Sequence, residues 1–287
     1  MKLSETTSAE GMMDRGRPGR SDRVAYGVSA ALAAVAALVS GISFFFWSVF
    51  DREVPMTIGN IRGTALAMLV IGVPLLIGSM LLSSRGSLRA RFVWLGSLAY
   101  VTYTAVILCF ALQFNSFFLL FAALLAVSFW ALVTLLSHFD FAAVTAGGAR
   151  VPVRAVAVYM LACVVVFSLP WLRDIIPATM RNVLPSSFEV TGITQNPIYV
   201  LDFAFTFPLM ALGAAWLWRR RAWGYVIAGM TVVMLTIETA SIAIGQAFGN
   251  LHDPAASLGG VPIMIAFTLA GLVFSALFLR GWAPKRG

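Results

Sequence analysis

Residues 197–221 read PIYVLDFAFTFPLMALGAAWLWRRR, an apolar stretch that ends in three arginines. A helix needs about 20 mostly apolar residues to cross the hydrocarbon core of a bilayer, and this stretch is long enough. One carboxylate, Asp202, interrupts it near its start. The stretch therefore predicts a membrane-spanning helix, and it raises the question of why such a helix carries an acid.

The whole chain has the composition of a membrane protein. Of its 287 residues, 60% are hydrophobic and only 11% are charged, whereas soluble domains carry about 25% charged residues. Backbone groups in lipid must pair within their own segment, and continuous apolar runs favour helices over a barrel. We therefore predict an all-α integral membrane bundle of eight transmembrane helices. The predicted segments are 24–50, 64–82, 92–112, 116–137, 153–171, 197–218, 222–247 and 260–280.

The basic residues predict the orientation of this bundle. If the N-terminus lies inside, all but four of the 20 Lys and Arg residues fall on the inner side; the exceptions are Arg52, Arg62, Arg173 and Arg181. This asymmetry is the positive-inside pattern and predicts that both termini are cytoplasmic. It also explains the net charge of +8 without nucleic acid as a partner. The domain organisation that follows is a disordered basic tail (1–23), a transmembrane domain (24–280) and a C-terminal tail (281–287).

Recurring features suggest that the domain consists of two tandem four-helix units, 24–137 and 153–280. Pro74 and Pro208 each lie in the middle of a predicted helix, in the second and sixth segments. Gln113 and Gln246 end the third and seventh segments at nearly the same spacing. Each unit would begin and end inside, which makes the repeat parallel, an arrangement known from transporters. The alternative is that prolines and terminal amides align by chance.

Two acids within the predicted helices are the strongest functional candidates. Glu238 lies well inside the seventh segment, and Asp202 lies close to the outer end of the sixth. An acid at the membrane centre costs about 2.5–3.5 kcal/mol on insertion scales and is a functional candidate by default. We expect the two to face each other in the outer half of the membrane and to line a small polar cavity.

Three further residues are expected at this cavity. Arg62, at the outer end of the second segment, is the candidate counter-charge, because its long side chain can reach inward. Thr206 follows Asp202 by four residues, and Ser241 shares a helical face with Glu238. The alternative interpretation is structural: Glu238 is a protonated donor between helices, and Asp202 caps or pairs locally.

Other chemistry finds little support in the sequence. No Lys lies between Lys2 and Lys285, and the two histidines, His138 and His252, fall in predicted loops. The sequence offers no nucleophile–base set, no metal-ligand spacing and no phosphate-binding loop, and it contains no C-x-x-C. We therefore expect no catalytic residues, no metal site and no cofactor, and we do not expect an enzyme.

Two stretches carry a resemblance. SSRGSLRARFVWLG (83–96) and NPIYVLD (196–202), the latter followed by LWRRRAWGYVIAG (217–229), resemble segments of bacterial polytopic membrane proteins with no established activity. The resemblance covers most of residues 24–280 and implies a bacterial plasma (inner) membrane location and the same multi-helix architecture. It implies no catalytic residue.

The sequence thus leaves two functions open. The first is a membrane protein that binds or transports a small solute, or relays protons, through the outer-half cavity around Glu238. The second is a non-transporting accessory or scaffold subunit that docks a membrane protein partner or a second copy of itself, with the two acids joining helices.

Overall fold

The computed structural model describes residues 20–191, 193 and 195–282, and the predicted tails lie mostly outside this part. The described residues form helices and no strands. Eight helical spans are long and apolar enough to cross a membrane, which confirms the predicted number and makes the chain a multi-pass membrane protein. Residues 20–23, expected in the N-terminal tail, form the first turn of the first helix.

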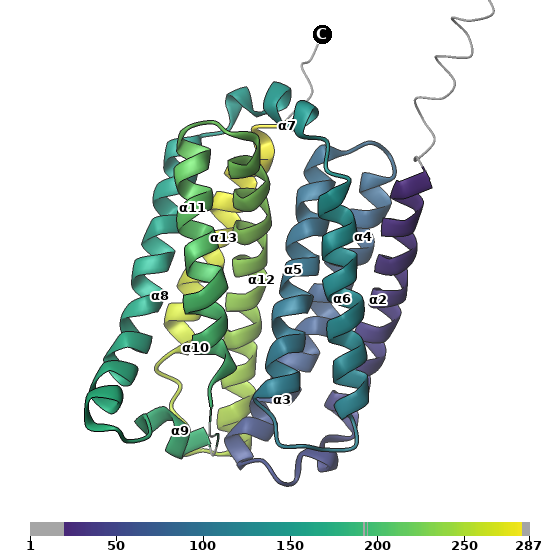
Figure 1. Ribbon diagram of the computed structural model, residues 1–287. Helices are drawn as coiled ribbons and strands as arrows, with labels where there is room; N and C mark the ends of the chain where they lie inside the picture. The colour runs from purple at the N-terminus through teal and green to yellow at the C-terminus, as the bar shows by residue number, and fades with distance from the viewer. Residues whose placement is uncertain (1–19, 192, 194, 283–287) are drawn as a thin grey trace, which may run out of the picture.

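The spans follow one another up and down the bundle, and Figure 1 shows that the first begins and the last ends at the same end of it. Three of them are α2 (Arg20–Phe45), α5 (Leu88–Phe110) and α6 (Phe118–Ser137). The second span consists of α3 (Pro55–Ala67), η3 (Met68–Gly72) and α4 (Val73–Ser83). The second half contains α8 (Val153–Arg181), α12 (Ala222–His252) and α13 (Val261–Arg280), together with a span made of α10 (Pro197–Leu201), η5 (Asp202–Thr206) and α11 (Phe207–Trp218). Short helices lie at the ends of the bundle: η2 (Trp47–Phe50), α7 (Phe141–Gly147), η4 (Gly148–Arg150) and α9 (Ser186–Thr191).

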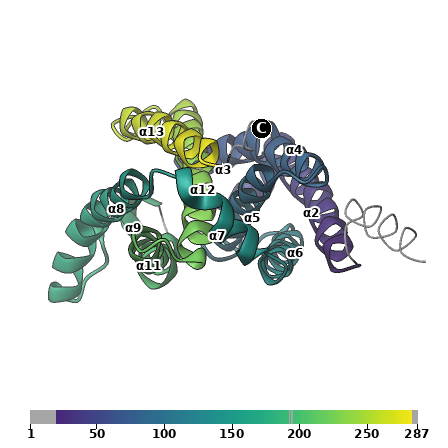
Figure 2. The same ribbon diagram turned by 90° about the horizontal axis from the view of Figure 1, so that it is seen from above.

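Seen from above, the helices form two groups (Figure 2). One group contains α2 to α6, and the other contains α8 to α13. They meet where α12 packs against α3 and α5. The helix α12 is the most buried of the eight spans and α13 the least buried. The centre of the molecule is therefore the interface between the two groups, with α12 at its core.

Several helix ends differ from the predicted ones. The second span begins at Pro55 rather than at residue 64, and α8 continues to Arg181 rather than ending at 171. Residues 172–181, which lie outside the predicted fifth segment, are the last part of α8. The helix α12 ends at His252, so this histidine is helical rather than part of a loop. Hydropathy misses these ends because their residues are polar.

Close helix packing explains the early start of α3. Gly59 and Gly63 on α3 face Gly245 and Gly249 on α12, and each pair is spaced by four residues. A Cβ atom on Gly63 would lie 2.6 Å from the Cα atom of Gly245, and one on Gly59 would lie 2.6 Å from the Cα atom of Gly249. This is the small-residue packing that brings membrane helices into backbone contact. Polar residues of α3 can therefore be helical, because they lie against α12 rather than in lipid.

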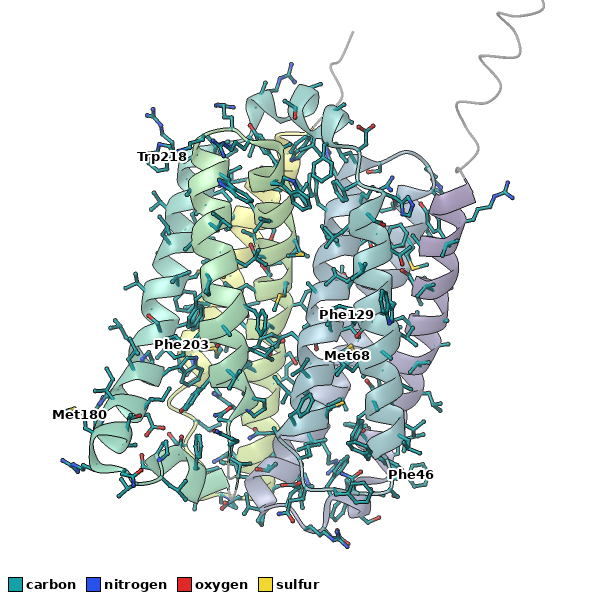
Figure 3. The ribbon with its side chains drawn as sticks, in the orientation of Figure 1. Phe46, Met68, Phe129, Met180, Phe203 and Trp218 are labelled. Atoms are coloured by element: carbon teal, nitrogen blue, oxygen red, sulfur yellow. The ribbon has the colours of Figure 1, made fainter. Side chains whose placement is uncertain are left out.

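Two spans contain a π-helical segment directly before a proline. The segments are η3 and η5, and Pro74 and Pro208 follow as the second residue of the next α-helix. Proline removes one backbone donor, and a π-turn locally rearranges the helical hydrogen bonds around it. Met68 and Phe203, one residue from each π segment, lie at a similar height in the bundle (Figure 3). The two spans are thus interrupted at the same level.

Candidate functional site

The carboxylate of Asp202 is buried and hydrogen-bonded from two helices. Asp202 is the first residue of η5, and its side chain is 7% exposed. The hydroxyl of Tyr103 on α5 donates to Oδ1 at 3.0 Å, and the indole N–H of Trp171 on α8 donates to Oδ2 at 2.9 Å. Both donors are neutral, so they stabilise the carboxylate without cancelling its charge. Asp202 therefore links α5 and α8 to the sixth span.

Glu238 lies at the middle of α12 and is buried without a matching donor. Its side chain is 9% exposed, and its Oε2 atom has no hydrogen-bond partner in the part of the chain that the structure describes. The carboxyl groups of Glu238 and Asp202 are near enough to interact electrostatically. Tyr103 lies within the electrostatic range of both acids. The two acids and Tyr103 of α5 are therefore grouped at one place in the structure.

Hydroxyl groups surround the acids. Tyr100 on α5 is completely buried and donates its hydroxyl to Oγ of Ser241 at 3.1 Å, and the ring also lies within the electrostatic range of Glu238. Thr206, the last residue of η5, interacts through its side chain with Asp202. The site is thus built from the two halves of the chain: α5 supplies phenols, and η5 and α12 supply acids and hydroxyls.

Arg62 is engaged elsewhere. Its Nη1 atom lies 2.9 Å from Nε2 of His252, and its Nε–H donates to the backbone oxygen of Phe44 at 3.3 Å. The guanidinium also lies over the rings of Phe44 and Trp47, at 5.3 and 5.7 Å from their centroids. Arginine can only donate, so Nε2 of His252 accepts and the imidazole proton sits on Nδ1, which donates to the carbonyl of Phe248 at 3.2 Å. These contacts join α2, α3 and α12 at their shared end.

Of the five predicted ligand residues, the structure brings together Glu238, Asp202 and Thr206, with Ser241 beside them. Arg62 is not among the described partners of either acid. The sequence analysis missed one residue of the site, Trp171, because nothing in the sequence shows that its N–H reaches Asp202.

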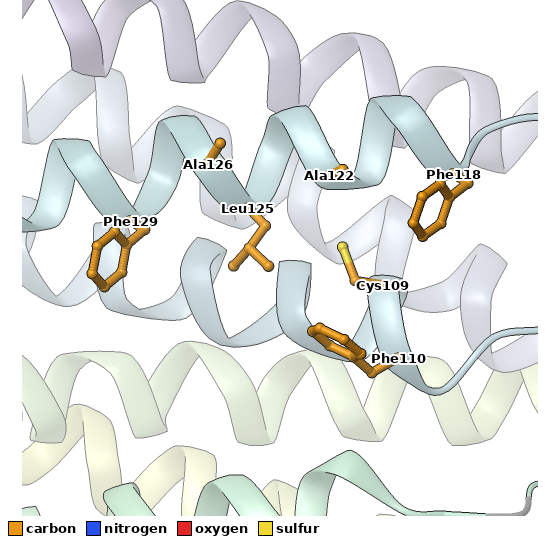
Figure 4. Close-up of a pocket in the computed structure, with 7 residues that line it drawn as sticks. All are labelled: Cys109, Phe110, Phe118, Ala122, Leu125, Ala126 and Phe129. Carbon is orange, nitrogen blue, oxygen red and sulfur yellow. The ribbon is translucent and has the colours of Figure 1, made fainter.

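The sequence analysis predicted a small polar cavity lined by the two acids, but the cavities described in the structure lie away from them. The groove in Figure 4 lies between α5 and α6, has a volume of about 460 Å³ and is lined by apolar side chains and Cys109. Two of its walls, Phe110 and Phe129, are 66% and 46% exposed, as expected of a surface in contact with lipid. This groove, a small internal cavity and three further surface grooves are all lined by residues other than Glu238 and Asp202.

The internal cavity lies within the first group of helices. Its volume is about 10 Å³, roughly the space of one water molecule. Ser43 and Thr104 line it, and the hydroxyl oxygen of Ser43 is buried without a hydrogen-bond partner among the described residues. The first group therefore has a neutral polar interior, whereas the two acids lie where it meets the second group.

Within residues 20–191, 193 and 195–282, no group of three His, Cys, Asp or Glu side chains is placed to hold a metal ion. No protein-family model, no curated protein and no solved structure matches this chain. A function has to be argued from the geometry of the site.

Proposed function

We propose that this protein binds a proton or a small cationic solute at Glu238 and moves it across the membrane. The single observation that carries the proposal is the Oε2 atom of Glu238, which is buried beside a second acid and has no donor in the described structure. Leaving a buried acceptor unpaired costs about 1–3 kcal/mol, and more if the group is charged. A proton or a cation at Glu238 would remove this cost.

The surroundings of Glu238 favour a cation over an anion. The acid has Asp202 nearby, while the predicted counter-charge, Arg62, is held by His252 and aromatic rings. Two acids without a basic partner attract positive charge, and phenols and hydroxyls can complete its coordination by hydrogen bonds. The exchange of a proton for a solute cation on Glu238 is the physical basis of proton coupling.

The position of the site fits a transporter built from two tandem units, 24–137 and 153–280. The two π segments support the repeat, because Met68 and Asp202 begin them and Gly72 and Thr206 end them at one constant spacing of 134 residues (202 − 68 and 206 − 72). In many transporters the substrate binds near the membrane midplane, between repeats and beside interrupted helices. Here the acids lie on an interrupted span and on α12, facing tyrosines of the other group.

We further propose the orientation and location given by the charges. The end of the bundle with α7 faces the cytoplasm of a bacterial cell, both termini are inside, and Glu238 is reached from the opposite side. The excess of Lys and Arg at the α7 end supports this assignment.

A second candidate function, an accessory subunit without transport, is favoured by one observation. Both carboxylate oxygens of Asp202 already accept a hydrogen bond, one from Tyr103 and one from Trp171, as expected of a structural link between helices. In that case Glu238 would be permanently protonated and would exchange nothing with either side of the membrane.

Carbodiimide labelling distinguishes the two. Dicyclohexylcarbodiimide partitions into bilayers and adds to protonated carboxyl groups, and the O-acylurea formed rearranges to a stable N-acylurea that mass spectrometry detects. We expect labelling of Glu238 to rise as the pH is lowered and to slow down when Na⁺, methylammonium or tetramethylammonium occupies the site. Glu238→Gln should lose the labelled peptide, and Glu53→Gln, in the loop before α3, should keep it. Labelling of Glu238 that is absent, or that depends on neither pH nor any cation, would overturn the proposal in favour of the accessory role.

A further inference from the structure

A basic groove lies at the α7 end of the bundle, where α8 begins and α11 ends. It has a volume of about 460 Å³ and is lined by residues 151–155 together with Trp218 and Arg220. Trp218 is 49% exposed and lies at the rim of the bundle in Figure 3. Tryptophan favours the level of the lipid headgroups. The groove therefore opens where a bilayer places its phosphates.

Two guanidinium groups line this groove, and both are held in position. The guanidinium of Arg154 lies over the ring of Trp218, with its central carbon 5.8 Å from the ring centroid. Arg220 has a φ of 54°, a conformation that bulky residues rarely adopt. Its Nη1 atom donates to the carbonyl oxygen of Ala149 at 3.3 Å and to the Tyr225 hydroxyl at 3.4 Å. Both side chains are thus oriented before any ligand binds.

The charge around the groove is of one sign. Arg150, Arg219 and Arg221 flank it in the sequence, and residues 149–155 and 218–222 contain no acid. A groove with two fixed arginines and no carboxylate is suited to a phosphate group, to which arginine donates two parallel hydrogen bonds.

An apolar surface continues from the groove towards the middle of the membrane. Val158, Leu161 and Val165 follow Arg154 at spacings of four, seven and eleven residues, so they share its face of α8. Their side chains are 54%, 42% and 56% exposed. A free phosphate would make no use of this surface, whereas an acyl chain attached to the phosphate would cover it.

We propose that this groove binds an anionic phospholipid. The phosphate lies between Arg154 and Arg220, the glycerol lies against Trp218, and one acyl chain follows the exposed residues of α8. This site is independent of the transport proposed for Glu238 and of the side of the membrane that the α7 end faces.

Native mass spectrometry of the detergent-purified protein tests this inference. Phosphatidylglycerol and phosphatidylcholine are titrated in turn against the wild type, Arg154→Gln and Arg85→Gln. The last variant is the matched control, because Arg85 is an exposed arginine in the loop between α4 and α5 at the same end of the bundle. One arginine at a membrane surface corresponds to about a fivefold change in lipid affinity. We therefore expect Arg154→Gln to weaken phosphatidylglycerol binding about fivefold, with affinity in Arg85→Gln unchanged.

Three results would overturn the proposal. The first is equal binding by Arg154→Gln and Arg85→Gln. The second is equal binding of phosphatidylcholine and phosphatidylglycerol to the wild type. The third is full displacement of phosphatidylglycerol by an equal concentration of glycerol 3-phosphate, which would show that the groove recognises a soluble phosphate. Melting curves in detergent confirm that each variant is folded, as expected for changes at exposed side chains.

Discussion

Replacing Gly63 by Ala tests how tightly α3 is packed against α12. The new Cβ atom would lie 2.6 Å from the Cα atom of Gly245 and 2.7 Å from the carbonyl oxygen of Ile244. Carbon atoms in contact prefer about 3.5–4.0 Å, so the helices must separate by roughly 1 Å. Neither contact atom can rotate away, because both belong to the backbone. Because both contacts are with backbone, overpacking should cost the upper end of its usual range, about 3 kcal/mol; alanine recovers about 0.5–1 kcal/mol of backbone entropy, which leaves a loss of about 2 kcal/mol.

The matched control is the same change on the opposite helix. A Cβ atom on Gly245 would lie 3.3 Å from Oγ1 of Thr64 and 3.4 Å from the backbone oxygen of Asn60. The hydroxyl can rotate, and the second distance is close to ordinary contact, so Gly245→Ala should be within about 1 kcal/mol of the wild type. The measurement is the free energy of unfolding in mixed detergent micelles, followed by the fluorescence of the eight tryptophans. Equal stability of Gly63→Ala and wild type, or equal losses in the two variants, would refute the packing argument.

Three further predictions concern polar groups. Ser43→Ala removes a buried hydroxyl without a described partner, and it should raise the free energy of unfolding by about 1 kcal/mol; a loss of stability would show that the hydroxyl is satisfied. Tyr103→Phe removes a hydrogen-bond donor to the Asp202 carboxylate and should lower the free energy of unfolding by about 1.5–3 kcal/mol. An unchanged free energy of unfolding would show that this hydrogen bond contributes nothing to stability. Burial raises the pKa of Glu53 despite the backbone N–H of Gln113 at 2.6 Å, so folding favours its protonated form and stability falls as the pH rises through the folded pKa. The stability of Glu53→Gln relative to the wild type should therefore increase between about pH 4 and pH 7. The measurement is thermal unfolding of both proteins at the two pH values. A difference in melting temperature that shrinks as the pH rises would contradict the prediction.

The number of helices and the compatible depths of the two acids could be predicted because they follow from simple quantities. Hydropathy determines which segments span the membrane, and helical rise determines that Asp202 and Glu238 lie at compatible depths. The prolines at 74 and 208 also marked the two spans that contain π segments, although proline alone does not specify a π-turn.

Other features depend on contacts between distant residues, which one sequence does not contain. The polar segment that includes Asn60 and Arg62 was left outside the predicted second helix. It is helical because it packs against glycines of α12, which lie more than 180 residues away in the sequence. Arg62 was predicted to face the acids because of its depth alone. In the structure it contacts His252, a residue that hydropathy had placed in a loop. Trp171 is a further case, because nothing in the sequence connects it with Asp202, 31 residues away.

In the proposed function, Glu238 exchanges its proton during transport. The direct measurement uses proteoliposomes that contain a pH-sensitive dye, to which gradients of Na⁺, K⁺, methylammonium or tetramethylammonium are applied. We predict that at least one cation drives proton movement in the wild type and in Glu53→Gln, and that Glu238→Gln, folded and with an unchanged melting curve, shows none. Proton movement of equal rate in Glu238→Gln, or none in the wild type with any of these cations, would contradict the account.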